Sequence, residues 1–294
     1  MDGLKIVRSK NRMRVIAERW RRAGLRVGFV PTMGALHSGH LALVKASQAE
    51  CERTVVSIFV NPIQFGPRED FSRYPRPLAR DRRLLVAQGV HALFVPSAAA
   101  MYAAGFSTKV WVGGELVARF CGPFRPGHFA GVTTVVAKLF NIVRPDAAFF
   151  GAKDAQQAAV VARMTADLDF GVAMRIIPTV RENDGLAMSS RNRYLSPAQR
   201  SSASCLYRAL KEGRTAVMLG ERRAGAVTAV VRRVLSAEPS LRLQYAELAD
   251  ARTFEPVTRL KGMIILAAAA RIGKTRLIDN VVMRVPGRKG IQGK

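Results

Sequence analysis

Apolar residues in the first 180 positions recur at helical spacing in several segments. Between residues 11 and 23, Met13, Ile16, Ala17 and Trp20 share one helical face, and Gly24 follows as a stop signal. The clearest amphipathic helix is predicted over 132–143, where Val, Leu and Phe recur every three or four positions. The same reasoning predicts further helices after His40, over 77–88 and after Asp154.

Short apolar runs rich in β-branched residues separate these helices. They predict strands at 27–30, 54–60, 91–95, 147–151 and 175–180. Strands that alternate with helices favour a parallel sheet with helices on both faces. The fold class predicted for residues 1–180 is therefore α/β, a Rossmann-like parallel sheet with helices on both faces.

The pattern changes after residue 180. Ser196 and Gln199 form a capping box with Pro197 at the first helical position, which predicts a helix from there to about Gly213. One more helix and three β-like segments follow, at 241–249, 263–270 and 275–284. Residues 181–294 are therefore predicted to form a smaller α+β domain, a candidate lid, and only the last residues, 287–294, read as a loose tail.

Composition excludes some classes of protein. With 294 residues and 49% apolar content, the chain can bury a full core. The first 20 residues contain no apolar segment of signal-peptide length, and the longest apolar run, 263–270, is too short to span a bilayer. The three cysteines lack paired or metal-type spacing. We expect a soluble cytoplasmic protein with no membrane contact, no disulfides and no structural zinc.

A formal net charge of +26 raises the alternative of a nucleic-acid-binding protein, because phosphate backbones attract Lys and Arg. The arginines, however, are spread through every segment and form only short clusters on the polar faces of predicted helices. No DNA- or RNA-binding signature occurs in the sequence. Solvated surface charge is the favoured explanation, with polyanionic ligands second, and no nucleic acid is expected as a partner.

Two histidines three positions apart follow the strand predicted at 27–30. His37 and His40 lie among glycines in a loop that leads into a helix. This order places backbone N–H groups and a helix N-terminus at the carboxyl edge of the sheet, where anions bind. A metal site is the alternative, but no carboxylate lies near them in sequence. Two loop histidines without a function are the simplest alternative.

His-x-Gly-His in this setting resembles the signature of the nucleotidyltransferase superfamily shared with class I aminoacyl-tRNA synthetases. That superfamily also uses a later phosphate loop, for which Met188-Ser189-Ser190-Arg191 is the candidate. Two hydroxyls and a guanidinium suit a triphosphate, because they donate several hydrogen bonds without bulk.

Four longer blocks narrow the resemblance to the pantothenate synthetase family. They are VPTMGALHSGHLALV, SIFVNPIQFGPREDFSRYPR, RPGHFAGVTTVVAKLFNIVRPDAAFFGAKDAQQ and VRENDGLAMSSRNRYL, in that order. The resemblance implies ATP-dependent condensation of pantoate with β-alanine to pantothenate, AMP and pyrophosphate through a pantoyl adenylate. It also implies Mg²⁺ held mainly by phosphate oxygens and water, with no protein metal site, and a homodimer.

The resemblance assigns a role to several residues. His40 matches the proton donor, and His37 and Lys153 complete the implied catalytic set. The ATP-binding set is Met33, Gly34, Ala35, Leu36, His37, Ser38, Gly39, His40, Gly151, Ala152, Lys153, Asp154, Val180, Met188, Ser189, Ser190 and Arg191. Gln64 and Gln157 match the glutamines that bind pantoate, Gln64 also lies near the implied β-alanine position, and Asn61 is a weaker candidate.

Two positions depart from the family pattern. Ala152 and Cys121 stand where many relatives have Glu, so no metal or ATP role passes to those two side chains. A P-loop-like ending at 271–275 lacks the required first glycine, and Gly273-Lys274 is interpreted as a hairpin turn. Another adenylyl- or cytidylyltransferase is the main rival, since it would share the histidine motif without needing Gln64 and Gln157.

Overall fold

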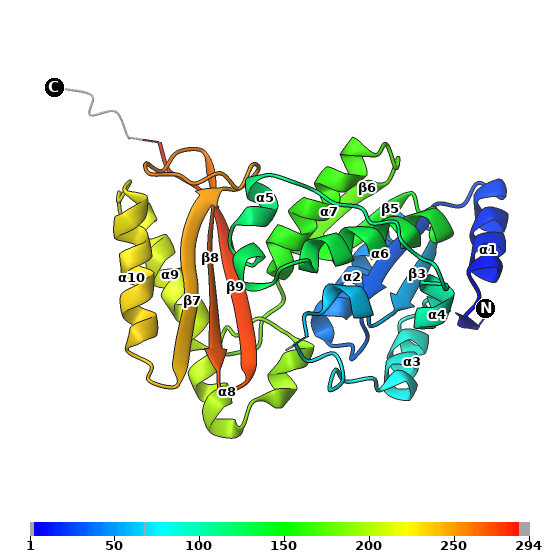
Figure 1. The fold of residues 1–294 in the computed structure, drawn as a ribbon, viewed down its shortest axis with the longest axis horizontal. Helices are drawn as coiled ribbons and strands as arrows, with labels where there is room; N and C mark the ends of the chain where they lie inside the picture. Colours follow the sequence, from blue (N-terminus) through cyan, green and yellow to red (C-terminus); the bar gives the residue numbers. More distant parts are fainter. Residues whose placement is uncertain (1–2, 68, 288–294) are drawn as a thin grey trace. The chain divides into compact units, whose positions relative to one another are not determined.

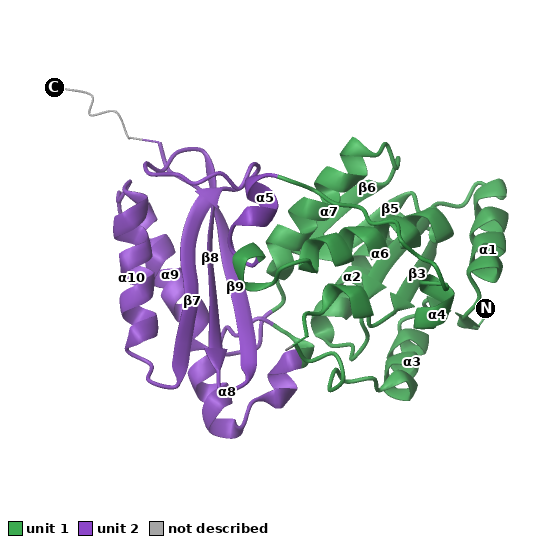
Figure 2. Ribbon diagram, viewed as in Figure 1, with its two compact units in different colours: residues 1–113, 122–180, 188–190 green, residues 114–121, 181–187, 191–294 purple. Residues whose placement is uncertain are grey.

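The structure, a computed structural model, describes residues 3–67 and 69–287 and divides into two compact units (Figure 2). Unit 1 comprises residues 1–113, 122–180 and 188–190, and unit 2 comprises 114–121, 181–187 and 191–294. This differs from the predicted division at 180 in two segments. Residues 114–121 belong to unit 2 because the ring of Phe120 packs edge-on against Tyr245 and Phe254. Residues 188–190 belong to unit 1, where Ser190 meets Tyr74.

Unit 1 is built on a six-stranded, fully parallel sheet with the order β1–β4–β3–β2–β5–β6 (Figure 1). The strands are β1 (Lys5–Val7), β2 (Val27–Thr32), β3 (Arg53–Ile58), β4 (Ala92–Phe94), β5 (Ala147–Gly151) and β6 (Ala173–Ile177). From β2 the chain first adds strands on one side and then crosses to add β5 and β6 on the other. The direction of winding therefore reverses between β2 and β5.

Helices cover both faces of this sheet. The helices of unit 1 are α1 (Lys10–Arg22), α2 (Ser38–Glu50), α3 (Leu78–Ala87), α4 (Ala98–Met101), α6 (His128–Val143) and α7 (Ala155–Asp167), with short 3-10 helices η1 (Pro62–Gln64), η2 (Gly122–Phe124) and η3 (Ala152–Asp154). On one face α1, α6 and α7 bury side chains such as Phe29, while on the other α2 and α3 pack against side chains such as Val30. Neighbouring residues of a strand point to opposite faces, which explains the continuous apolar runs.

Unit 2 is a three-stranded antiparallel sheet, β7 (Leu241–Asp250), β8 (Met263–Ile272) and β9 (Thr275–Arg284), with helices packed against it (Figure 1). The helices are α5 (Glu115–Ala118), α8 (Pro197–Ala203), α9 (Cys205–Met218) and α10 (Ala224–Ser236), and the 3-10 helix η4 (Ser190–Tyr194) begins at the last residue of unit 1. Ile272 pairs with Thr275, so Gly273-Lys274 is the predicted two-residue hairpin turn.

The predicted fold class is confirmed, and several elements differ from their predicted limits; α6, for example, begins at His128, four residues before its predicted start. The strand predicted at 175–180 is β6, which ends at Ile177 because Pro178 has no N–H to continue the ladder. The helix predicted from Pro197 to Gly213 is two helices, separated at Ser204. The first strand, β1, was not predicted. From residue 288 on, the predicted loose tail lies outside the described residues.

Within residues 3–67 and 69–287, no helix is long and apolar enough to cross a membrane. The three cysteines are free thiols, and all three are buried.

Candidate active site

The carboxyl ends of β2 and β5 meet at the point where the sheet reverses its winding. The two strands pair directly, with Gly28 opposite Ala147 and Phe29 opposite Ala148. In open α/β sheets, ligands bind outside the strand ends at such a point. The segments that leave β2 and β5 are the histidine turn, residues 33–40, and the segment 151–154. The fold therefore brings two of the predicted ATP-binding stretches, 33–40 and 151–154, to the ends of neighbouring strands.

The two histidines form the N-terminus of α2. His37 is the N-cap, and its Nδ1 accepts the backbone N–H of Gly39 at 3.2 Å. Nδ1 of His40 accepts the backbone N–H of His37 at 3.4 Å, and the ring centroids are 4.0 Å apart. A neutral imidazole that accepts at Nδ1 carries its proton at Nε2. Both rings therefore offer an Nε2–H donor.

His40 is held in its neutral form. Burial and the neighbouring His37 lower its pKa to about 3; Asp154 opposes the shift and Lys153 adds to it. At neutral pH the ring is therefore a hydrogen-bond donor without a positive charge. The influence of both residues also places the segment 151–154 next to the histidine pair.

Asp81, near the start of α3, binds the backbone of the histidine turn. Its carboxylate accepts the backbone N–H groups of Ala35 at 2.7 Å and Leu36 at 2.9 Å, while Gly34 donates its own to Thr32 Oγ1 at 3.1 Å. Asp81 is 1% exposed, and burial raises its pKa despite these two bonds. Ala35 and Leu36, two residues of the predicted ATP-binding set, are buried, and their N–H groups already donate to the Asp81 carboxylate.

The second predicted phosphate loop lies beside the histidine turn. The backbone N–H of Met188 donates to the carbonyl of Val180 at 3.0 Å, which closes the loop base. A side chain added at Gly39 would lie 3.7 Å from Cβ of Met188, so the two loops are neighbours. The hydroxyl of Ser190 lies 3.0 Å from that of Tyr74, and both residues are buried. Ser189 is half-buried, and Arg191 begins the next stretch of unit 2.

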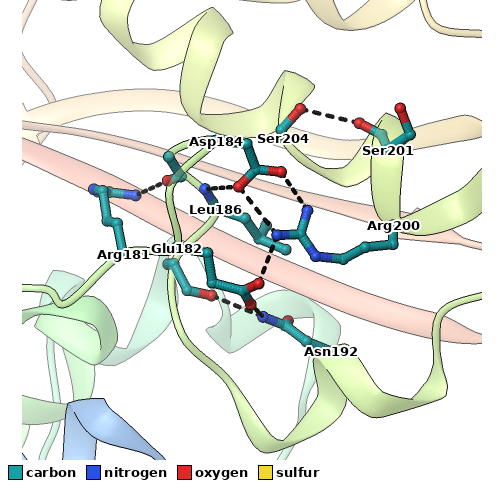
Figure 3. Close-up of polar contacts among 10 residues, drawn as sticks. Arg181, Glu182, Asp184, Leu186, Asn192, Arg200, Ser201 and Ser204 are labelled. Carbon is teal, nitrogen blue, oxygen red and sulfur yellow. Dashed lines mark hydrogen bonds and ion pairs between the residues drawn. The ribbon is translucent and has the colours of Figure 1, made fainter. Parts of the chain in front are cut away.

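The chain on either side of this loop is tied together within unit 2 (Figure 3). Asn192 donates from Nδ2 to Glu182 Oε1 at 2.8 Å and to the carbonyl of Ala187 at 3.2 Å. Arg200, on α8, donates to Glu182 at 2.6 Å and also to Asp184. These bonds lower the pKa of Asp184 and raise that of Arg200. The network fixes the spacing between residue 187 and residue 192, where the loop begins and ends.

Lys153 and Asp154 follow β5 on η3. The ammonium nitrogen of Lys153 lies 3.5 Å from Oδ1 of Asp154, with 19% and 47% of their side chains exposed. Gly151 and Ala152, beside them, are half-buried. Both charges act on His40, so Lys153 supplies the cation at this edge of the sheet.

Gln64 is buried next to Met33, the first residue of the histidine turn. Its Oε1 accepts Nδ2 of Asn61 at 2.9 Å, and its Nε2 donates to the Met33 sulfur at 3.2 Å. Gly131 of α6 lies against this segment, and a Cβ there would come within 2.6 Å of Gln64 Cα. The segment that carries Gln64 therefore packs directly against α6.

A second group of side chains holds the backbone of Gln64. His128, the first residue of α6, donates from Nδ1 to the Gln64 carbonyl at 2.8 Å, and its Nε2 accepts from Arg125 at 2.8 Å. Burial and Arg125 lower the pKa of His128 to about 3. Arg125 in turn makes two bonds to Glu69, at 2.6 and 2.7 Å. Although burial alone would raise the pKa of Glu69, these bonds lower it.

Gln157 lies on α7, one turn after Asp154, and is half-buried. Its amide makes no hydrogen bond to another described residue. Among residues 3–67 and 69–287, no three His, Cys, Asp or Glu side chains gather in a group that could hold a metal ion. Cys121 is buried in unit 2, with its sulfur 3.4 Å from the hydroxyl of Tyr245.

Comparison with known proteins identifies the family. The family model for pantoate-beta-alanine ligase matches residues 5–282. The chain belongs to the pantoate–β-alanine ligase family. A pantothenate synthetase of Moorella thermoacetica is 53% identical over 265 residues, which cover 90% of this chain and 93% of the relative. That of Heliobacterium modesticaldum is 51% identical over 96% of this chain and 100% of the relative.

Solved structures of the same family agree. The crystal structure of pantothenate synthetase from Thermus thermophilus has a TM-score of 0.89 and 46% identity, and the match covers 94% of this chain and 98% of that one. The pantoate-beta-alanine ligase of Francisella tularensis, solved with beta-gamma ATP and beta-alanine, has a TM-score of 0.78 and 31% identity over 95% of this chain and 98% of its own. The chain is therefore an ATP-dependent ligase that joins pantoate and β-alanine, through the adenylate intermediate of this family.

Several residues that shape this candidate site were not singled out in the sequence. Asp81, Tyr74, His128 and Arg125 come from other segments and reach the site only through the fold. His128 and Arg125 lie inside one of the family-like blocks, yet their contact with Gln64 joins positions 64 residues apart. Asp81 follows the block that ends at Arg76, and its contact with the turn spans 45 residues.

Proposed function

We propose that adenylate formation takes place at the carboxyl edge of the unit 1 sheet, around the histidine turn. The observation that supports this most directly is the close pair of imidazoles, His37 and His40, with His40 held neutral, next to Lys153 and to the loop at 188–190. Neutral donors and one cation can hold a triphosphate and stabilise the charge that develops when it reacts. The ligase activity itself is that of the family, and we propose which residues carry it out.

The chemistry needs positioning and charge stabilisation. A pantoate carboxylate oxygen attacks the α-phosphorus of ATP, and the bond to the bridging oxygen breaks as pyrophosphate leaves. We assign to Nε2–H of His40 a hydrogen bond to the phosphate oxygens as their charge grows, with His37 as a second donor. Lys153 neutralises charge on the leaving pyrophosphate. In the second step the amine of β-alanine attacks the acyl carbon, loses a proton and expels AMP.

The other predicted ATP-binding residues form the walls of this site. Met33, Ser38 and Gly39 belong to the histidine turn, Gly151, Ala152 and Asp154 to the η3 segment, and Ser189 and Ser190 to the second loop. For Ala35 and Leu36 we propose a supporting role, because their N–H groups already bind Asp81. Val180 and Met188 form the loop base, where Val180 would contact the adenine and Met188 would close over the phosphates with the rest of the loop.

Gln64 and Gln157 are proposed to bind pantoate, and Gln64 also to border the β-alanine position. A compact acid with hydroxyls needs amide partners set in apolar walls, and Gln64 is buried beside Met33. Site groups that hydrogen-bond a substrate hydroxyl discriminate against analogues that lack it. Gln157 adds an amide with no partner among the described residues.

Magnesium is proposed to arrive with ATP. The donor set fits an ion held mainly by phosphate oxygens and water, because the described residues include no cluster of three metal-ligating side chains. Asp154, beside Lys153, is a candidate for a contact with the nucleotide, and we assign no protein residue as a direct metal ligand. The ion would neutralise phosphate charge.

Unit 2 is proposed to act as a lid that excludes water from the adenylate. The chain passes between the units at 113/114, 121/122, 180/181, 187/188 and 190/191, so the candidate phosphate loop lies at one of the covalent junctions. Arg191, the first residue beyond it, would then reach the phosphates on closure. Small-angle scattering with and without ATP and pantoate tests this, and identical profiles would contradict it.

We further propose a cytoplasmic homodimer. The resemblance implies the dimer, and an ATP-consuming enzyme with three free cysteines suits a reducing compartment rich in ATP. Light scattering coupled to size-exclusion chromatography measures the mass in solution, and a monomer across all concentrations would contradict the dimer.

Omitting one substrate at a time tests the proposed reaction course. We expect AMP release from ATP and Mg²⁺ only when pantoate and β-alanine are both present. Pantoate alone should support exchange of labelled pyrophosphate into ATP, since the adenylate forms before β-alanine reacts. Exchange that requires β-alanine would contradict the proposed order of steps.

A further inference from the structure

Three side chains from two segments, Tyr102 after α4 and Asn61 and Gln64 at η1, form a hydrogen-bonded chain that ends at Gln64. The hydroxyl of Tyr102, directly after α4, lies 2.7 Å from Oδ1 of Asn61. Nδ2 of Asn61 then lies 2.9 Å from Oε1 of Gln64. Asn61 is 1% exposed and Gln64 is 7% exposed. At such burial each polar atom needs a partner in the protein or in the substrate.

The carbonyl of Gly131 fixes the direction of this chain. Because a carbonyl only accepts, the Asn61 atom 3.0 Å from it must be the amide nitrogen. That same nitrogen faces Gln64, so the Gln64 atom opposite must be the oxygen. The other end of the Asn61 amide is then its oxygen, which accepts from Tyr102. The NH₂ group of Gln64 is consequently turned away from Asn61.

We propose that Tyr102 is a positioning residue that holds Asn61 and Gln64 in this direction, so that Gln64 offers only N–H donors to an oxygen atom of pantoate. This rests on the proposed function, in which Gln64 contacts pantoate. In the structure Nε2 donates to the Met33 sulfur at 3.2 Å, and a thioether is a weak acceptor. A carboxylate or hydroxyl oxygen is a far better one, so pantoate gains a bond that the protein holds ready.

The ring of Tyr102 has a separate structural task. It packs near Phe59 and Phe106, with centroids 6.2 and 4.9 Å away, and the ammonium of Lys138 lies 5.7 Å above it. A phenylalanine keeps all three contacts and loses only the hydroxyl. Tyr102→Phe therefore separates the hydrogen-bonded chain from the packing.

The test uses steady-state kinetics of the full-length enzyme at pH 8. The variants are Tyr102→Phe, Gln64→Ala, Gln64→Glu and the double variant Tyr102→Phe/Gln64→Ala. Tyr207→Phe is the control, because it also removes one hydroxyl but lies in unit 2, where its ring stacks with Arg181. KM for pantoate and KM for ATP are measured separately for each.

Tyr102→Phe is expected to raise KM for pantoate about tenfold, the effect of leaving one buried polar atom without its partner. KM for ATP should stay unchanged, as should every constant of Tyr207→Phe. Gln64→Glu should impair pantoate binding at least as much as Gln64→Ala, because an ionised carboxylate has no N–H to donate. Adding Tyr102→Phe to Gln64→Ala should change KM for pantoate no further, since the hydroxyl acts through Gln64.

Three results would overturn the inference. If Gln64→Glu binds pantoate like the wild type, Gln64 accepts a hydrogen bond instead of donating one. If Tyr102→Phe has the same effect with and without Gln64, the hydroxyl does not act through this chain. In both cases a raised KM for pantoate in Gln64→Ala leaves the proposed pantoate site standing. If Gln64→Ala itself binds pantoate normally, the pantoate assignment and the inference fail together.

Discussion

The backbone N–H of His37 donates to Nδ1 of His40, and this single bond decides what His40 can do. With Nδ1 occupied as an acceptor, the ring must present Nε2–H to any ligand. A ring whose pKa is about 3 stays neutral throughout the physiological range. His40 therefore acts as a hydrogen-bond donor to phosphate and does not titrate near pH 6.5.

Replacing His40 should slow adenylate formation without a change in its pH profile between pH 6 and pH 8. We expect His40→Ala to lower the rate roughly 100-fold, the usual loss for a donor to developing charge. His40→Gln keeps a neutral N–H at a similar distance and should retain part of the activity. Pantoate-dependent pyrophosphate exchange measures the rate. If the wild-type rate falls as the pH rises, with a midpoint near pH 6.5 that His40→Gln does not show, then the charged ring is required.

Removing the Asp81 carboxylate should loosen the histidine turn. In Asp81→Ala the N–H groups of Ala35 and Leu36 are left buried without partners, which should lower the free energy of unfolding by about 2 kcal/mol. Asp81→Asn keeps one acceptor and carries no charge for burial to disfavour, so it should be less damaging. Urea unfolding and pyrophosphate exchange measure both effects.

Asp167→Asn is the matched control. This carboxylate is 54% exposed and pairs only with Arg163 one turn away on α7, so its loss should change stability by less than about 0.5 kcal/mol. Equal destabilisation by Asp81→Ala and Asp167→Asn would show that the contact with the turn contributes nothing.

His37 and Asp81 differ in whether their place in the site could be predicted from the sequence alone. A strand, a glycine-bearing loop and a helix start lie within 15 residues, so local pattern sufficed to place the histidine turn at the edge of the sheet. Asp81 reaches the same turn from another helix, and no periodicity links positions that far apart. Similarly, the helix break at Ser204 lacks Gly or Pro, and Ser204 keeps right-handed helical backbone angles, so the pattern predicted one continuous helix.

His128 should make the stability of unit 1 depend on pH. Its pKa is about 3 in the folded chain and about 6.5 when unfolded, so between these values the unfolded state binds the additional proton. Stability is therefore full above pH 6.5 and falls as the pH is lowered. From pH 7 to pH 5 the loss due to this one group should be roughly 2 kcal/mol.

His128→Asn removes the titrating group and keeps a donor close to the Gln64 carbonyl. Free energies of unfolding in urea at pH 7 and pH 5 are measured for both proteins. The wild type should lose more stability than the variant over this range. Equal losses would mean that the imidazole is not held neutral.

Gly131 should resist any larger side chain. A Cβ at this position would lie 2.5 Å from the Ile63 carbonyl oxygen and 2.6 Å from Gln64 Cα, and backbone atoms cannot turn aside as flexible side chains do. Gly131→Ala should therefore displace Gln64, raise KM for pantoate and reduce stability by roughly 1–3 kcal/mol. Gly225→Ala, on an exposed position of α10 with nothing near, should be neutral or slightly stabilising. Similar thermal shifts in the two variants would contradict the close approach of α6 to Gln64.

Arg200 should affect nucleotide use although it lies on α8, outside the predicted ATP-binding set. It donates to Glu182 and Asp184, and Glu182 also holds Asn192, so its loss frees both ends of the loop at 188–191. Because misplacing groups that position a substrate slows reaction, Arg200→Met should lower kcat/KM for ATP about tenfold. These side chains are partly exposed, so stability should change by less than about 1 kcal/mol. Arg223→Met, which removes a 3.0 Å pair with Glu221 in which the arginine is 81% exposed, controls for the lost charge and should leave kcat/KM unchanged. Equal kinetics for the two variants would show that the network does not hold the loop.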